Sequence, residues 1–430
     1  MFNADSAIEK WKGLLDHKDV APIKDKYKRA VTAALLENQE RALKEEKSQR
    51  EFLSEAENTT ASIDKYDPVL ISLVRRAMPN LIAYDIAGVQ PMNQPTGLIF
   101  AMKSLYKSPS AGSATDEGEA LFYGKGTAQE SPDTAFSGDQ SANDGSALNT
   151  QTGEALTGRR DTAGSNSGFG EMGFEITKTS VEAKTRALRA TYTMELAQDL
   201  KSVHGLDAES ELANILSTEI LAEINREIID GINFAAEQGG PAKDETFDLS
   251  ADTDGRWSVE KYKALIYQLE VEANEIALRS RRGKGNWILA SSNVASAMAA
   301  AGQLDYAPAM QTDLDVDPTG NLFAGMLNGR MKVYVDPYVS GERVTVGYRG
   351  SNPYDAGVFY CPYVPLTMVR AVGENDFQPR IGFKTRYGVR ANPFVDGTDG
   401  SGNDRFGSQD GNFYFRTFVV SNLVGTDVSS

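Results

Sequence analysis

The sequence predicts an α+β protein, in which long helices and long strands occupy separate stretches of the chain. Three observations predict this class. Apolar residues recur at every fourth position through residues 208–236, residues 174–193 follow an alternating pattern, and residues 357–420 are rich in β-branched and aromatic side chains. With 430 residues and 40% hydrophobic content, the chain can bury several cores, so a disordered protein is excluded.

Charge and residue usage exclude several classes of function. The net charge of −16 argues against a protein that mainly grips nucleic acid, because phosphate contacts need an excess of Lys and Arg. Cys361 is the single cysteine, and His17 and His204 are far apart, so we expect no disulfide and no cysteine or histidine metal site. No apolar run reaches the ~18 to 20 residues of a membrane span, which predicts a soluble protein of the cytosol.

Residues 1–55 are predicted to form a detachable helical segment. They contain 11 basic and 11 acidic residues, whereas the rest of the chain carries the whole net charge. Pro22 ends a first helix, and a second runs from about Asp25 to Phe52. The second helix has only a thin apolar stripe, which favours packing on partner helices over packing in a core. A solvated helical arm is the alternative.

The segments 97–106 and 174–193 are predicted to be long strands of one projecting element. A run such as 174–193 would reach about 60 Å if fully extended, too far for one small domain. We expect an arm that lies on a neighbouring subunit, with the charged face of the strand (Glu182, Lys184 and Arg186) against that subunit. Two shorter strands joined by a bend are the alternative. Between the segments, residues 107–173 hold 12 glycines and favour a loop-rich insertion domain over a linker.

The central helix over 208–236 begins after Asp207, a plausible N-cap, and would span ~44 Å. It is predicted to be a spine along which strands pack. A second α and β region follows. Its predicted elements are the helices Val259–Ser280 and Val294–Ala301 and the strands Asn286–Ala290, Met331–Val335 and Arg343–Tyr348.

A search for catalytic or ligand motifs finds none that is complete. The stretch Gly118–Lys125 lacks the spacing of a phosphate loop. The calcium-loop-like aspartates at 313–317 lack the glycine and glutamate that such a loop requires, and those at 396–404 fail in the same way. We therefore expect no catalytic residue, no metal and no cofactor, and we expect Cys361 to be a packed thiol.

Four blocks of sequence resemble the major capsid (head) proteins of T-even-like tailed phages. They occur in order and cover most of the chain from about residue 66 onward, with the weakest match over 107–173. The blocks are Leu73–Met102, Tyr192–Glu227, Tyr334–Tyr338 and Tyr363–Val389.

This resemblance implies the Hong Kong 97-type capsid fold, with an N-terminal arm, an extended β-loop, a peripheral domain built on the spine helix, and an axial domain. The implied parts are a propeptide 1–55, the arm 56–96, the extended loop 97–106 and 174–193, the insertion domain 107–173, the peripheral domain 194–254 and 361–430, and the axial domain 255–360.

The resemblance also implies a function in assembly. Hexamers of the chain would form the head shell of the virion around a scaffold core, in the cytoplasm of the host bacterium. The implied partners are other copies of the chain, the vertex capsid protein, the portal, the scaffold core, the prohead protease and enclosed double-stranded DNA. A vertex subunit of the same virus type is one alternative, and an intracellular enzyme with a helical docking segment is another.

The family's assembly protease cuts after Glu in a Leu/Ile-x-Glu pattern. The chain has four matches, which end at Glu37, Glu45, Glu55 and Glu223. The last lies in the predicted spine helix, where a protease finds no extended backbone. Leu53-Ser54-Glu55 lies where the charge composition changes, so the resemblance predicts scission between Glu55 and Ala56, removal of the helical segment, and expansion of the shell.

Overall fold

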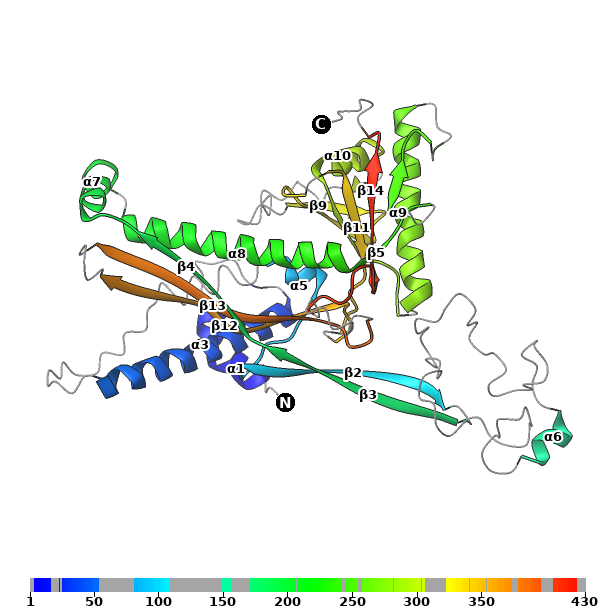
Figure 1. The fold of residues 1–430 in the computed structure, drawn as a ribbon, viewed down its shortest axis with the longest axis horizontal. Coiled ribbons are helices and arrows are strands. Elements are labelled where there is room, and N and C mark those ends of the chain that lie inside the picture. The colour runs from blue at the N-terminus through cyan, green and yellow to red at the C-terminus, as the bar shows by residue number, and fades with distance from the viewer. Residues whose placement is uncertain are drawn as a thin grey trace.

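A long helix, α8 (Ala208–Ala235), is the spine of this computed structural model (Figure 1). Asp207 caps its N-terminus, since the Asp207 carboxylate accepts a hydrogen bond from the Glu209 amide. Every fourth residue from Leu216 to Ile232 is buried. The helix predicted over residues 208–236 is confirmed.

The structure describes most of the chain. The described residues are 4–16, 23, 25–53, 81–107, 149–156, 171–205, 207–241, 245–251, 253, 257–280, 282–302, 304–305, 322–339, 341–352, 354–372, 378–395 and 405–423.

A four-stranded sheet in the order β1-β12-β13-β4 lies against α8 (Figure 1). β12 and β13 form a long antiparallel pair, β4 continues the antiparallel pattern, and β1 adds to the other edge in parallel. Buried side chains of the sheet and of α8 share one core, which includes Ile224, Phe383 and Tyr360. The strands are β1 (Gly88–Val89), β4 (Lys184–Thr191), β12 (Val358–Val372) and β13 (Pro379–Ala391).

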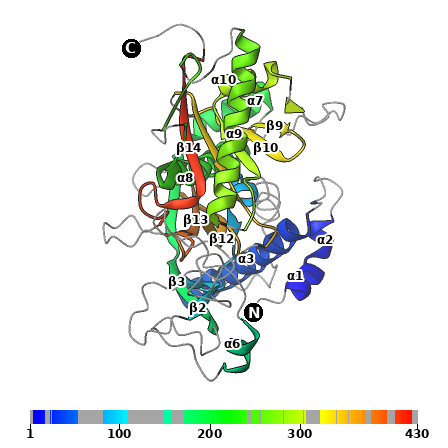
Figure 2. The same cartoon turned by 90° about the vertical axis from the view of Figure 1, so that its right-hand side faces the viewer.

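An eight-stranded sheet with a second core lies at the C-terminal end of α8. Two helices, α9 (Ser258–Ser280) and α10 (Ser292–Ala300), pack against it, and Figure 2 shows α9 running alongside β14. The sheet follows the order β5-β14-β11-β7-β10-β9-β8, with β6 paired to β14. Its strands are β5 (Ala236–Gln238), β6 (Thr246–Asp248), β7 (Trp287–Ala290), β8 (Leu304–Asp305), β9 (Leu322–Leu327), β10 (Met331–Val335), β11 (Arg343–Gly347) and β14 (Asn412–Ser421).

A two-stranded antiparallel arm projects away from both sheets (Figure 1). It consists of β2 (Thr96–Lys107) and β3 (Glu171–Glu182), which pair along their whole length. The segment 174–193 is therefore two strands joined at Ala183, the alternative considered from sequence. The extended β-loop ends at Glu182, and β4 leaves the arm to pair with β13.

The N-terminal helices pack into the main core, which differs from the expectation of a segment that avoids a core. They are α1 (Ala4–Lys10), α2 (Lys12–Leu15) and α3 (Lys26–Leu53). All six residues 31–36 of α3 are buried, and α3 lies along β12. The helix gets close to the sheet because Thr32, Ala33 and Ala34 are small and fully buried.

Strand pairing divides the chain differently from the expected domain ranges. β14 belongs to 361–430, which we expected to be peripheral, yet it pairs with β11 in the eight-stranded sheet. β5 and β6 belong to 194–254 and join the same sheet. β5 directly follows α8 and pairs with β14, so the chain enters the second sheet as soon as the spine helix ends.

The remaining described helices are short. α5 (Ala83–Ile86) precedes β1, and α7 (Met194–His204) precedes the spine. Of the insertion domain expected between the two arm strands, the structure describes residues 149–156, which include α6 (Thr150–Glu154). Among the described residues, no helix has the length and apolar character needed to cross a bilayer.

Candidate assembly interface

One face of the β2–β3 arm carries large apolar side chains that the rest of the chain leaves uncovered. Leu98, Phe100 and Ile176 are 53%, 52% and 67% exposed. Leu98 and Phe100 are two residues apart, and Ile176 pairs with Met102 further along β2, so all three point to the same side. Lys178 and Ser180 lie on the same face, opposite Phe100 and Leu98. Large exposed apolar side chains gathered on a projecting element are typical of a surface that another protein chain covers.

The opposite face of the arm is anchored at its root. Ile99 and Val181 are buried against Phe359 and Cys361 of β12. A Cβ atom added at Gly388 of β13 would lie 2.4 Å from the Val181 side chain, so glycine is needed for this close approach. The arm thus has one side seated on the body and one side free.

A charge cluster joins β4 to the spine where the strand leaves the arm. The Arg186 guanidinium lies 2.8 Å from the Glu223 carboxylate and 2.5 Å from Glu227, and it donates to the Tyr387 hydroxyl at 2.9 Å. Arg405 also pairs with Glu227, and the Tyr387 hydroxyl donates a hydrogen bond to the Glu227 carboxylate. The cluster ties the strands β4 and β13, the spine and the loop before β14 together through charge-assisted hydrogen bonds.

This cluster corrects the expected orientation of the strand. We expected Arg186 to lie on a charged face that meets another subunit. Instead Arg186 faces the chain's own spine and Ala187 is exposed. The break at Ala183 shifts the alternation by one residue, which exchanges the two faces.

The environment of the cluster sets the ionisation of its members. Burial alone would raise the pKa of Glu227, but hydrogen bonds from Tyr387 and Arg186 and the charge of Arg405 lower it on balance. Burial, and then the hydrogen bond to Glu227, raise the pKa of Tyr387 well above its ordinary value. Glu227 is therefore an anion and Tyr387 a neutral hydrogen-bond donor at neutral pH.

A second charge cluster is fully buried between α9 and the eight-stranded sheet. The guanidinium Nε of Arg416 lies 2.5 Å from the Glu272 carboxylate, and both side chains are 2% exposed. Glu272 also accepts from the Gly240 amide and from Gln268, so its oxygens are satisfied. The Glu237 carboxylate lies 3.4 Å from Nη1 of the Arg416 guanidinium.

At the far end of the molecule, α7 lies near the ends of β12 and β13 (Figure 1), and both α7 and β12 carry exposed apolar side chains. No residue of α7 is buried, and Val203 is 72% exposed. Val372 at the end of β12 is 65% exposed. The Gln378 side chain accepts a hydrogen bond from the Met194 amide, and Arg370 of β12 pairs with Glu209 of α8. These two contacts hold the helical segment next to the ends of β12 and β13.

The four Leu/Ile-x-Glu matches fall in different environments. Those ending at Glu37 and Glu45 lie within α3, and the one ending at Glu223 lies within α8, where Glu223 pairs with Arg186. Leu53 is the last residue of α3, while Ser54, Glu55 and Ala56 lie outside the described residues. Regular helix denies a protease the extended backbone that it needs.

Most of the motifs considered for catalysis or ligand binding lie where the structure does not describe the chain. The aspartate loop at 313–317, the glycine-rich stretch at 118–125 and His17 lie outside the described residues. In the part of the chain that the structure describes, no three His, Cys, Asp or Glu side chains are grouped to hold a metal ion. Burial raises the pKa of Cys361 to about 12, so this thiol is unreactive at neutral pH.

Comparison with known proteins identifies the family of this chain. The family model "Major capsid protein Gp23" matches residues 63–420. The chain belongs to the Gp23 major capsid protein family. It is 37% identical to the major capsid protein of Enterobacteria phage T6, over 90% of this chain and 95% of that protein. It is 41% identical to the major capsid protein of Serratia phage KSP90, over 85% of this chain and 87% of that protein.

A vertex protein is a more distant relative. The capsid vertex protein of Enterobacteria phage T4 is 28% identical over 54% of this chain and 55% of that protein. Among solved structures, the capsid of phage XM1 overlaps 79% of this chain and 92% of that one at 9% identity, with a TM-score of 0.40. The match to Gp23 proteins is both closer and longer than the match to the vertex protein.

Sequence reasoning found the arm and the spine of this Gp23 family member but missed both charge clusters. Arg186, Glu227 and Arg405 are separated by tens to hundreds of residues, and no local pattern connects them. Arg416 sits in a strand of mostly apolar residues, which is the one signal that a buried partner was needed.

Proposed function

We propose that this chain is the main shell subunit of a tailed-phage head and that it assembles with copies of itself into hexamers and then a closed shell. The exposed apolar face of the β2–β3 arm carries the proposal, because it needs a cover that the described chain does not supply. The same surface would lie on the next subunit of a ring, a heterologous contact that closes by rotation. The role is structural and not enzymatic.

The relatives support a shell position over a vertex position. Matches to major capsid proteins extend over 90% of the chain, whereas the match to the vertex protein extends over 54%. The vertex protein, portal, scaffold core and prohead protease are the proposed partners of assembly. The net charge of −16 suits a wall around packaged double-stranded DNA, because an acidic interior surface repels the DNA and does not bind it.

Maturation would proceed by a cut between Glu55 and Ala56. The family match begins at residue 63, after this position. The described part of α3 ends at Leu53, so this Leu-x-Glu match begins at the helix end, whereas the other three lie inside helices. The cut would detach α1–α3, whose core contacts are extensive. Departure of these helices would uncover apolar surface, so we expect it to be coupled to the rearrangement that expands the shell.

Microscopy and light scattering of the expressed full chain test assembly. We expect rings, tubes or shells far above the 46.7 kDa of one chain. A monomer or dimer across salt and concentration would contradict the proposal and favour the enzyme alternative.

Mass spectrometry of mature particles tests the cut. We expect an N-terminus at Ala56, and a Glu55→Gln chain that stays uncut in the presence of the protease. Glu45→Gln is the matched control, since this match lies within α3, and it should be cut as the wild type is. Mature particles that retain Met1 would contradict the proposed site.

A further inference from the structure

Helix α3 holds the segment that leads into the arm. The Asn38 amide donates to the Met92 carbonyl at 2.7 Å and to the Tyr363 carbonyl at 3.0 Å. Arg41 donates to the Asn93 carbonyl at 3.0 Å. Asn38 is buried, so these hydrogen bonds are shielded from water.

Two further contacts hold the same segment from the preceding turns of α3. The Tyr27 hydroxyl donates to the Val89 carbonyl, and Lys28 lies 3.3 Å from the Asp85 carboxylate. Side chains along four turns of one helix therefore contact a stretch of nine residues, 85–93. This stretch contains β1 and leads toward the first strand of the arm.

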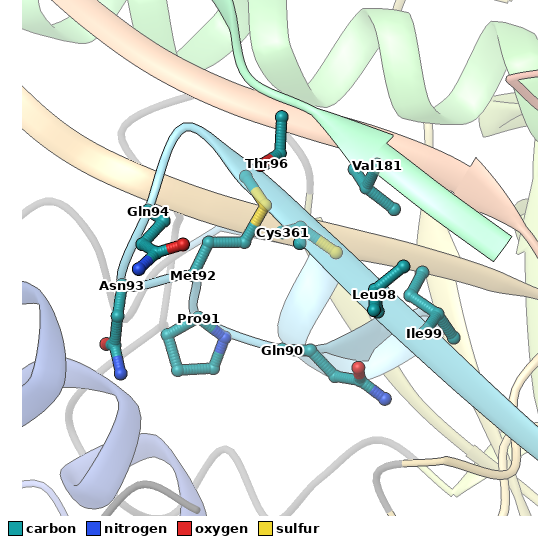
Figure 3. A pocket seen from close by; sticks show the side chains of 11 residues that line it. Gln90, Pro91, Met92, Asn93, Gln94, Thr96, Leu98, Ile99, Val181 and Cys361 are labelled. Carbon is teal, nitrogen blue, oxygen red and sulfur yellow. The ribbon is translucent and has the colours of Figure 1, made fainter. Parts of the chain in front are cut away.

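The root of the arm is the place where a change of direction would occur. The amides of Gln90 and Met92 donate to carbonyls of β12, and the amide of Ala183 donates to the Pro95 carbonyl at 2.8 Å. Beneath the first residues of β2 lies a pocket of about 340 Å³. Figure 3 shows the Met92 side chain reaching toward Thr96 and Cys361 in this pocket. This side of the root therefore faces an open pocket, while its other side packs on β12.

Beyond the root, the arm contacts little else. Among described elements, β2 packs mainly against β3, and β3 also contacts β13. A rotation at residues 90–96 and at Ala183 would therefore reorient the arm by repacking the root contacts of Ile99 and Val181 with β12. It would leave the two large cores intact. Within the N-terminal segment, the hydrogen bonds that Asn38 and Arg41 of α3 make to Met92 and Asn93 oppose this rotation.

We propose that α3 is a latch on the root of the arm: Asn38 and Arg41 fix the direction of β2–β3 while the N-terminal segment is attached, and its departure frees the arm to reorient. The inference rests on the proposed cut after Glu55. It assigns to the segment an action on the arm in addition to its action as a removable helix.

Hydrogen–deuterium exchange of the uncut, unassembled full chain tests the latch. In the variant with both Asn38→Ala and Arg41→Ala, amides at 90–99 and 181–183 should exchange about tenfold faster or more, and in Arg41→Ala alone about twofold faster. Amides of β14 should be unchanged. Arg29→Ala is the matched control, because Arg29 pairs with Asp16 inside the N-terminal segment, at 2.9 Å, and should leave the root protected.

Unchanged exchange at the root in the double variant, with α3 still protected, would overturn the latch. If α3 itself loses protection in the double variant, Arg41→Ala decides, since Arg41 is exposed and its loss should not unfold the helix. Unchanged root exchange in that variant overturns the proposal, and faster exchange supports it. Because the measurement uses unassembled chain, its outcome is separate from whether shells form or the segment is cut.

Discussion

The arm and the eight-stranded sheet are stabilised in opposite ways. The sheet buries its apolar side chains in its own core and encloses Arg416 and Glu272 with all contacts supplied from the same chain. The arm is two strands wide and leaves Leu98, Phe100 and Ile176 uncovered. Two isolated strands are marginal in water. The sheet is therefore complete in one subunit, while the arm acquires its full stability only in contact with another.

This contrast separates folding residues from assembly residues. A substitution in the sheet should lower the stability of the single chain and affect assembly only as a consequence. A substitution on the free face of the arm should leave the single chain intact and affect assembly directly. The predictions below follow this contrast from the largest expected loss of stability to the smallest.

The largest loss is expected for Arg416→Met, which leaves the buried carboxylate of Glu272 without its cation. Breaking a buried pair on one side costs about 3 to 5 kcal/mol of unfolding free energy. Urea denaturation of the unassembled chain measures it. Glu219→Gln is the matched control, since its pair with Arg226 is 52% and 40% exposed and should contribute less than about 1 kcal/mol. Equal losses in the two variants would contradict a self-contained sheet.

Gly347→Ala should destabilise the same sheet by overpacking. A Cβ at this position of β11 would lie 2.1 Å from the buried Trp287 ring. Forcing a methyl group into such a core costs about 1 to 3 kcal/mol. Gly382→Ala in β13 is the control, because its added Cβ would have no neighbour closer than 3.8 Å and should be near neutral. Thermal denaturation compares the two, and a neutral Gly347→Ala would refute the tight packing.

The Glu227 cluster lies between the two regions and should respond to acid. Because the folded-state pKa of Glu227 is lowered, its stabilisation is fully present above pH 4.5 and is lost as pH falls through the folded value. Glu227→Gln should be less stable than wild type at pH 7. The gap should close on acidification, by at most about 1.4 kcal/mol per pH unit. Urea midpoints between pH 3 and pH 7 measure this, and a gap that widens toward acid would contradict it.

Much of the fold follows from local patterns in the sequence. The apolar residues at every fourth position from Leu216 to Ile232 predict the spine helix. The predicted strand Met331–Val335 has the observed bounds. In both elements the spacing of apolar residues agrees with the observed burial. Of the elements expected of a Hong Kong 97-type capsid chain, the extended two-stranded loop and the spine helix are present among the described residues.

Other features depend on contacts that no local pattern encodes. The alternation through 174–193 is continuous in sequence, so the break at Ala183 and the exchange of faces at Arg186 follow only from pairing with two different partners, β2 and β13. The burial of α3 was missed because Ala33 and Ala34 count little in an apolar stripe. They are buried because small side chains allow close packing.

The most direct test of the central claim is Phe100→Ser on the free face of the arm. Phe100 is 52% exposed in the single chain, so the unfolding free energy should change by no more than about 0.5 kcal/mol. The shells and rings that we expect of the wild-type chain in microscopy should be absent for the variant at the same concentration. Lys178→Ser, at the position paired with Phe100, controls for a polar change on the same face and should still assemble. Normal shells from Phe100→Ser would contradict the account.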